Sequence, residues 1–108
     1  MIIKYGIEIS TEAITKDIDR ITNQIFKLLP SREEGGEWEA PLNNLILELG
    51  GMSELLKDQQ LNLFILLCKL ETLYQLKEEE DFFQFRRIIF ECLSLLNQIK
   101  KEVLTWAD

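Results

Sequence analysis

The chain has 108 residues, of which 46% are hydrophobic and 29% charged, and its formal net charge at neutral pH is −7. This composition is typical of one globular domain that is large enough to bury a core. It excludes a disordered chain. The negative charge repels phosphate backbones and anionic lipids, so we expect neither direct nucleic-acid binding nor membrane binding.

The chain contains no histidine and therefore lacks the commonest general base and the commonest metal ligand. Cys68 and Cys92 lie in apolar stretches, which favours two free thiols in a reducing compartment over a disulfide. No signal-peptide pattern opens the chain, and its apolar runs are much shorter than the roughly 20 residues of a membrane-spanning helix. We expect a cytoplasmic protein. A composition rich in Ile, Lys, Glu and Asn suggests a bacterial or phage source.

Residues 2–9 alternate between apolar and other residues, which is the pattern of a half-buried strand. Ile3, Tyr5, Ile7 and Ile9 share one face. No second strand is evident, so this segment is expected to pair with another chain, to pair with a copy of itself, or to lie as an extended arm along the helices. The predicted organisation is an arm over residues 1–9 and one helical domain over residues 10–108.

The first helix is predicted to begin after an N-cap at Ser10 or Thr11 and to end at Pro30. Its apolar seam follows spacings of three and four residues. Residues 30–40, which contain Gly35-Gly36, four glutamates and one tryptophan, are predicted to form a loop. Trp38 is expected either to pack back onto the helices as a lid or to stand exposed as an anchor for a partner.

A second helix is predicted over residues 41–57, because the apolar spacing continues through Gly50-Gly51. Two shorter helices separated by the glycines are an equally acceptable interpretation. The third helix, residues 59–77 with Asp58 as its cap, is apolar around most of its circumference, which predicts a place in the middle of a bundle.

An acidic turn at residues 78–81 precedes the last helix, predicted over residues 82–106 with Asp81 and Gln84 as a capping box. Residues 88–96 carry an apolar face that is broader than one antiparallel neighbour can cover. The predicted fold is all-α: an antiparallel four-helix bundle with a short N-terminal extended segment.

Two carboxylate-rich segments, 33–39 and 78–81, are the first candidates for metal binding or acid–base chemistry. Neither has the spacing of a calcium loop, so both are interpreted as solvated loops. A carboxylate–metal enzyme would need glutamates that face inward. Neither cysteine has a histidine partner, and no nucleophile or phosphate-binding motif is present. We expect no catalysis, no cofactor and no metal.

The surplus of apolar surface and the unpaired strand point to a non-catalytic protein–protein interaction module. Such a module would be a small helical subunit or adaptor that oligomerises, or that docks into a larger assembly through its last two helices. Its partner would be a second copy or a different subunit. The alternative is an acidic inhibitor that occupies a basic nucleic-acid channel on another protein. The predicted interface residues are Ile3, Tyr5, Trp38, Ile88, Phe90, Leu93, Leu95 and Trp106.

Overall fold

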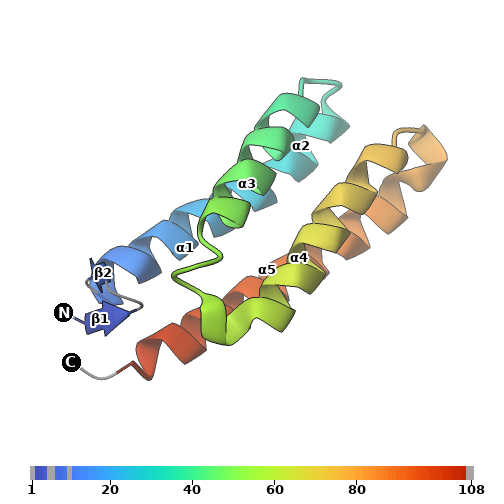
Figure 1. Cartoon of the computed structure of the whole chain (residues 1–108). Coiled ribbons are helices and arrows are strands. Elements are labelled where there is room, and N and C mark those ends of the chain that lie inside the picture. The colour runs from blue at the N-terminus through green and yellow to red at the C-terminus, as the bar shows by residue number, and fades with distance from the viewer. Residues whose placement is uncertain (1, 5–6, 10, 107–108) are drawn as a thin grey trace.

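The computed structural model describes residues 2–4, 7–9 and 11–106, with the strand residues and Lys57 described by their backbone. Five α-helices account for most of this part of the chain, and the predicted all-α class is confirmed (Figure 1). They are α1 (Thr11–Phe26), α2 (Leu28–Glu33), α3 (Glu39–Gly51), α4 (Gln60–Thr72) and α5 (Phe82–Leu104). Three short 3₁₀ turns, η1 (Lys57–Gln59), η2 (Leu73–Gln75) and η3 (Glu79–Asp81), flank α4 and precede α5.

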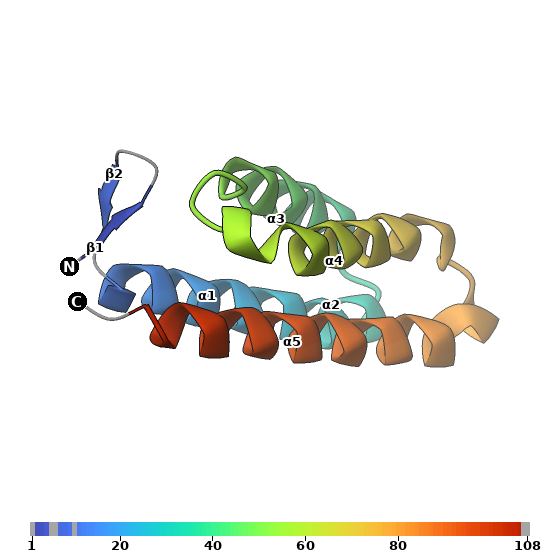
Figure 2. The ribbon, with the colours of Figure 1, turned by 60° about the horizontal axis from the view of Figure 1, so that its bottom comes forward.

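Each of the four longer helices packs against two others. Helix α1 contacts α3 and α5, and α4 contacts the same two helices from the other side. The chain leaves the end where both termini lie along α1, returns along α3, leaves again along α4 and returns along α5 (Figure 2). The result is an elongated molecule of 47 × 21 × 20 Å.

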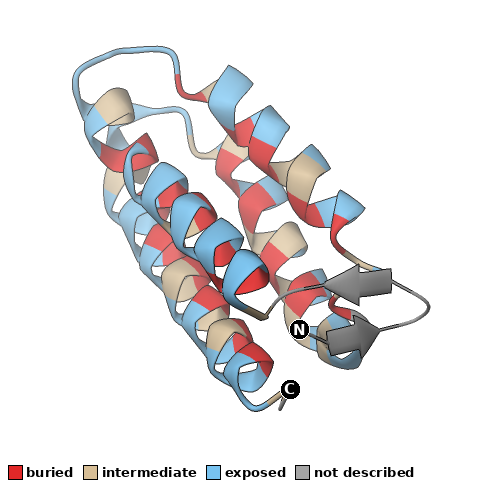
Figure 3. Cartoon of the chain, turned by 90° about the vertical axis from the view of Figure 1, so that its left-hand side faces the viewer, coloured by how far each residue is buried: buried red, intermediate tan, exposed pale blue. Residues whose placement is uncertain are grey.

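The core consists of the inward face of each helix (Figure 3). On α1 the predicted seam of isoleucines at spacings of three and four residues is buried. Burial of such side chains stabilises the fold by roughly 1.5–3 kcal/mol each. The largest of the fully buried side chains are Phe85, Ile18, Ile21, Ile25, Leu28, Leu42, Leu49, Leu56, Leu66, Leu70, Leu73 and Ile89.

The helical path continues through Pro30, and the predicted helix end at this residue is wrong. The chain leaves the regular helix for one residue, Lys27, and α2 then runs from Leu28 to Glu33. Pro30 therefore lies in the first turn of α2, where a backbone N–H group is not needed for an internal hydrogen bond.

Helix α3 ends at Gly51, so the prediction of one helix through residue 57 is wrong. Turns follow instead of a second α-helix, and η1 then leads into α4. Met52 and Leu56 are nevertheless buried, at 7% and 1% exposure. The apolar spacing therefore predicted burial correctly. The helix nevertheless ends between the buried residues Leu49 and Met52, where two adjacent glycines lower the helix propensity.

The ends of the last two helices also differ from the prediction. Gln59 occupies the N-cap position of α4 in place of Asp58, and α4 becomes a 3₁₀ turn after Thr72. Before α5, the carboxylate of Asp81 accepts a hydrogen bond from the N–H of Glu78 at 3.3 Å. The capping box therefore closes η3, one turn earlier than the predicted pairing with Gln84.

The N-terminal segment folds back on itself. Strand β1 (Ile2–Lys4) pairs antiparallel with β2 (Ile7–Ile9), and Ile2 lies opposite Ile9. The expectation of one strand without an internal mate is therefore wrong. An alternating pattern does not distinguish one strand from two that pair with each other, and this pairing satisfies backbone hydrogen bonds within the chain.

Candidate functional site

Two of the large apolar side chains that are exposed in the described part of the chain lie on one face of α4. Leu61 is 72% exposed and Phe64 65% exposed, and Cys68, one further turn along, is also exposed. We call these three residues the α4 stripe. On the opposite side of the helix Leu63, Leu66 and Leu70 are buried. The predicted central position of this helix is therefore wrong, because among the described residues α4 packs mainly against α3 and α5, and its outer face is exposed.

Helix α5 behaves in the opposite way. It packs against both α1 and α4, so two neighbours cover the broad face for which one was insufficient. Ile88, predicted as an interface residue, is only 5% exposed and belongs to the core, while Leu93 and Leu95 are partly buried against it. Phe90 remains 43% exposed, and the guanidinium of Arg86 lies 5.1 Å from its ring centroid.

Trp38 packs inward as a lid, and its selection as an exposed interface residue is corrected. It is 9% exposed, and its ring meets Phe85 edge-on with centroids 5.1 Å apart. The neighbouring glutamates do not prevent this burial, because Glu37 is exposed and Glu39 is half-buried in an ion pair with Lys77. This T-shaped contact adds to the stability that the buried area provides.

Arg32, which the sequence did not single out, joins the two loops at this end of the molecule. Its guanidinium donates to the carbonyl oxygen of Leu76 from Nε at 3.2 Å and from Nη2 at 2.8 Å, and to the carbonyl of Glu78 at 2.7 Å. It also lies 4.8 Å from the ring centroid of Phe85. Only an arginine offers several fixed donors together with a planar face for aromatic contact.

The fold brings the two acidic segments to the same end of the molecule (Figure 1). Lys77 forms an ion pair with Glu39 at 3.2 Å between them. Glu37 is more than a solvated loop residue, because its carboxylate accepts hydrogen bonds from the N–H groups of Glu39 and Ala40 and so caps α3. We call this region the acidic end. It contains a groove of about 610 Å³ lined by Arg32, Glu33, Gly35, Gly36, Trp38, Lys77, Glu79, Phe82 and Phe83.

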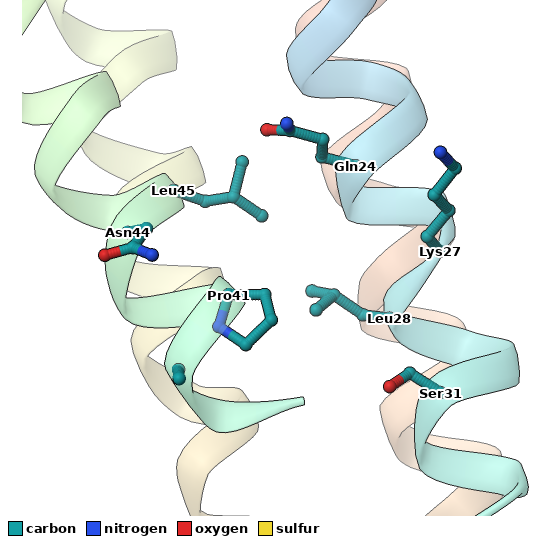
Figure 4. Close-up of a pocket in the computed structure, with 8 residues that line it drawn as sticks. Gln24, Lys27, Leu28, Ser31, Pro41, Asn44 and Leu45 are labelled. Atoms are coloured by element: carbon teal, nitrogen blue, oxygen red, sulfur yellow. The ribbon is translucent and has the colours of Figure 1, made fainter. Parts of the chain in front are cut away.

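A second groove, of about 480 Å³, lies between α3 and the α1–α2 segment (Figure 4). The side chains of Leu28, Pro41 and Leu45 lie in the gap between the helices, and the amides of Gln24 and Asn44 lie at its margins. The groove can therefore hold an apolar group and hydrogen-bond a polar one. Lys27 is the one ionisable residue among those that line it.

The two cysteines have different environments. Burial raises the pKa of the Cys92 thiol to about 12, with smaller opposing effects of Lys69 and Glu91. Cys92 is therefore a neutral core residue, whereas Cys68 is exposed, and both are free thiols. Within the described ranges, no group of three or more cysteine, aspartate or glutamate residues is arranged to hold a metal ion.

The remaining predicted interface residues lie near the chain ends. The backbone of Ile3 belongs to β1, and Tyr5 lies outside the described residues. Trp106 is partly buried, and its carbonyl accepts a hydrogen bond from the hydroxyl of Thr11 at 3.5 Å. Of the eight predicted residues, Phe90 at 43% is thus the one whose described side chain is exposed. Sequence reasoning missed Leu61 and Phe64, although the excess of apolar residues on α4 was their signal.

Comparison of the chain with protein-family models, curated proteins and solved structures finds no match. None of the described helices combines the length and the apolar character needed to cross a membrane.

Proposed function

We propose that this protein is a non-catalytic protein–protein interaction module, an antiparallel four-helix bundle that binds its partner through outward-facing side chains. The α4 stripe carries this proposal. Exposed leucine and phenylalanine side chains contribute nothing to the core of the isolated chain, and grouped on one helix face they form the kind of apolar surface that protein interfaces cover. On α5, Phe90 and Arg86 form a second exposed surface, and aromatic and arginine side chains are enriched in protein interfaces.

The partner in this proposal is a second copy or a different subunit of a bacterial or phage assembly. A cytoplasmic location accords with the exposed free thiol of Cys68, since an oxidising compartment would favour its oxidation. The charge of −7 favours a protein partner over a nucleic acid.

A glutamate in the α4 stripe tests the proposal. We expect Phe64→Glu to lose association that the wild type shows in light scattering and in chemical cross-linking of its native lysate. The matched control is Leu47→Glu, which places the same charge at an α3 residue that is 67% exposed. Two results together overturn the proposal. The purified wild type is monomeric, and wild type and Phe64→Glu give the same cross-linked products in the lysate.

The acidic inhibitor is a second candidate, which the meeting of the two acidic segments at one end supports. Mimicry of a phosphate backbone requires concentrated negative charge on one surface. We expect the protein to compete with DNA for a basic DNA-binding protein, with an affinity that falls steeply as salt rises. Glu78→Gln combined with Glu80→Gln should weaken this competition at least several-fold. Competition that is insensitive to salt and to these substitutions would exclude mimicry.

A further inference from the structure

We propose that the groove at the acidic end binds a basic segment of a partner protein through an arginine side chain. This inference rests on the proposed interaction module and assigns to it a second binding surface, separate from the α4 stripe. The groove has a volume of about 610 Å³ and is lined by residues of α2, of the turn before α3, and of the connection that leads into α5. Its volume lies within the range of ligand pockets.

The two cations that line the groove are already engaged within the chain. Arg32 donates hydrogen bonds to the carbonyl oxygens of Leu76 and Glu78. Lys77 forms an ion pair with Glu39 at 3.2 Å. An anion in the groove would compete with these internal contacts.

The two carboxylates of the lining have no such partner. Glu33 and Glu79 are exposed, and neither forms an ion pair with another residue in the described part of the chain. They belong to separate elements, α2 and η3, so the negative charge does not come from one local run. The chain as a whole carries a charge of −7, and its field adds to the attraction of a cation. The charge balance of the groove therefore favours a positively charged occupant.

The aromatic part of the lining favours a guanidinium group over an ammonium group. The Phe82 ring already has the guanidinium of Arg32 at 5.4 Å from its centroid, whereas Phe83 is 80% exposed. A guanidinium group is planar, stacks on aromatic faces and binds a carboxylate through two parallel hydrogen bonds. An ammonium group is a strongly hydrated point charge without this geometry. An arginine can thus use the Phe83 ring and a carboxylate of the lining together.

Two glycines allow a peptide backbone to approach the groove. Gly35 and Gly36 are exposed lining residues, and a Cβ added at Gly35 meets nothing within 4 Å. This part of the lining consists of backbone without side chains, which is a common feature where another chain comes close. The occupant is therefore a segment of a polypeptide and not an isolated small cation.

One arginine in an open groove predicts weak binding. Most of the contact area remains accessible to water, and the partner segment loses conformational freedom when it binds. We expect a dissociation constant on the order of 100 micromolar for a short peptide at physiological salt. This affinity should fall as salt rises.

A nuclear magnetic resonance titration of the isotope-labelled full chain tests the occupant. The probe is the acetylated and amidated peptide Gly-Arg-Leu-Arg-Leu-Arg-Leu-Arg-Gly, and two matched peptides carry lysine or glutamate in place of every arginine. We expect the arginine peptide to shift the amide signals of Gly35, Gly36 and Phe83. The lysine peptide should bind at least threefold more weakly, and the glutamate peptide should not bind.

Three results of this titration would overturn the inference. They are an arginine peptide that leaves these signals unchanged up to millimolar concentration, a lysine peptide that binds as tightly as the arginine peptide, and a glutamate peptide that shifts the same signals.

Charge-matched variants separate the groove from the general charge of the molecule. Glu33→Gln combined with Glu79→Gln should weaken binding of the arginine peptide at least fivefold. The control, Glu34→Gln combined with Glu80→Gln, removes the same charge from adjacent exposed residues outside the lining and should leave binding within twofold. Equal weakening by both pairs would show attraction by the overall field and overturn the inference. Phe83→Ser should weaken binding at least threefold, because the exposed ring is lost.

Sedimentation velocity distinguishes a partner protein from a second copy of the chain. Self-association that Glu33→Gln combined with Glu79→Gln abolishes would assign the groove to a second copy and overturn the inference. A failure of the peptide titration would end this inference alone, because the proposed function is tested at Phe64 on a different surface.

Discussion

Arg32 shows how one side chain can fix the distance between two loops. Its three hydrogen bonds to backbone carbonyls of the α4–α5 connection, and its contact with Phe85, join α2 to a segment more than 40 residues away in sequence. We expect Arg32→Ala to lower the free energy of unfolding by about 2–3 kcal/mol, because charge-assisted hydrogen bonds to partly buried carbonyls are lost. Arg32→Lys should recover less than half of this loss, since lysine lacks the fixed planar donors. Urea denaturation measures both, and an Arg32→Lys variant as stable as the wild type would contradict this explanation.

The two thiols should differ in reactivity. Because Cys68 is exposed and Cys92 is buried, we expect a maleimide to modify one thiol of the native protein rapidly and the second only after unfolding. Mass spectrometry of the peptides identifies the modified residue. Rapid native modification of Cys92 would show that the core around it opens.

The raised pKa of Cys92 also gives a pH dependence of stability. Its pKa rises on folding from 9.0 to about 12, so the contribution of the buried neutral thiol is complete below pH 9 and declines between pH 9 and 12. The loss is at most about 1.4 kcal/mol per pH unit. We expect Cys92→Ala to show a shallower fall of unfolding free energy than the wild type between pH 9 and 10.5. The comparison uses the slope, which the cavity left by the substitution does not change. Equal slopes would contradict the assigned shift.

At the scale of elements, two glycines should respond oppositely to alanine. Gly50 is helical, and a Cβ added there meets nothing within 4 Å, whereas Gly35 has a φ of 75°. We expect Gly50→Ala to raise the free energy of unfolding by about 0.5–1 kcal/mol through helix propensity. Gly35→Ala should lower it by about 1 kcal/mol, because L residues adopt this conformation at a cost. Thermal denaturation of both variants measures the difference, and the same sign for both would be unexpected on this geometry.

Helix positions and buried faces could be predicted from apolar spacing, but helix ends could not. The spacing on α1 identified Ile14, Ile18 and Ile21 as core residues, and all three are buried. The apolar spacing does not show at which residue the backbone hydrogen bonds of a helix end. Pro30 is tolerated inside α2, and α3 ends at Gly51 while the buried pattern continues. Burial depends on which side chains face the core. Met52 and Leu56 still face it, although they lie in turns and not in a helix.

The candidate site could be predicted only in part, because exposure depends on how many neighbours each helix acquires. The breadth of the apolar face on α5 suggested an interface at Ile88, but α1 and α4 together cover it. For α4 the error was the reverse. A helix apolar around most of its circumference suggested a central position, but its outer face is exposed. The sequence shows how much apolar surface each helix has. Which part of that surface stays exposed depends on which other helices pack against it.

For the whole molecule, the core is complete within one chain. The buried residues of all four longer helices contact each other, and the α4 stripe lies outside this core. We therefore expect the chain to unfold cooperatively at concentrations where it is monomeric. Phe64→Glu should change the free energy of unfolding of this monomer by less than about 0.5 kcal/mol. Chemical denaturation at submicromolar protein, followed by fluorescence, measures it. A large loss would mean that Phe64 belongs to the fold and not to an interface.

The hydrogen bond between Thr11 and Trp106 has a consequence for the order of the helices along the chain. Since Thr11 at the start of α1 and Trp106 after α5 are in contact, a short linker between them would close the helical part of the chain into a ring. New ends could then be opened in any one of the three connections that join the α1–α2 segment, α3, α4 and α5. Opening the chain at Gly35-Gly36 would leave Arg32 and Trp38 on separate termini, whereas opening it after Gly51 would leave that end of the molecule unchanged. The four longer helices thus form a cyclic arrangement in which each contacts two others, and several linear sequences could encode the same packing.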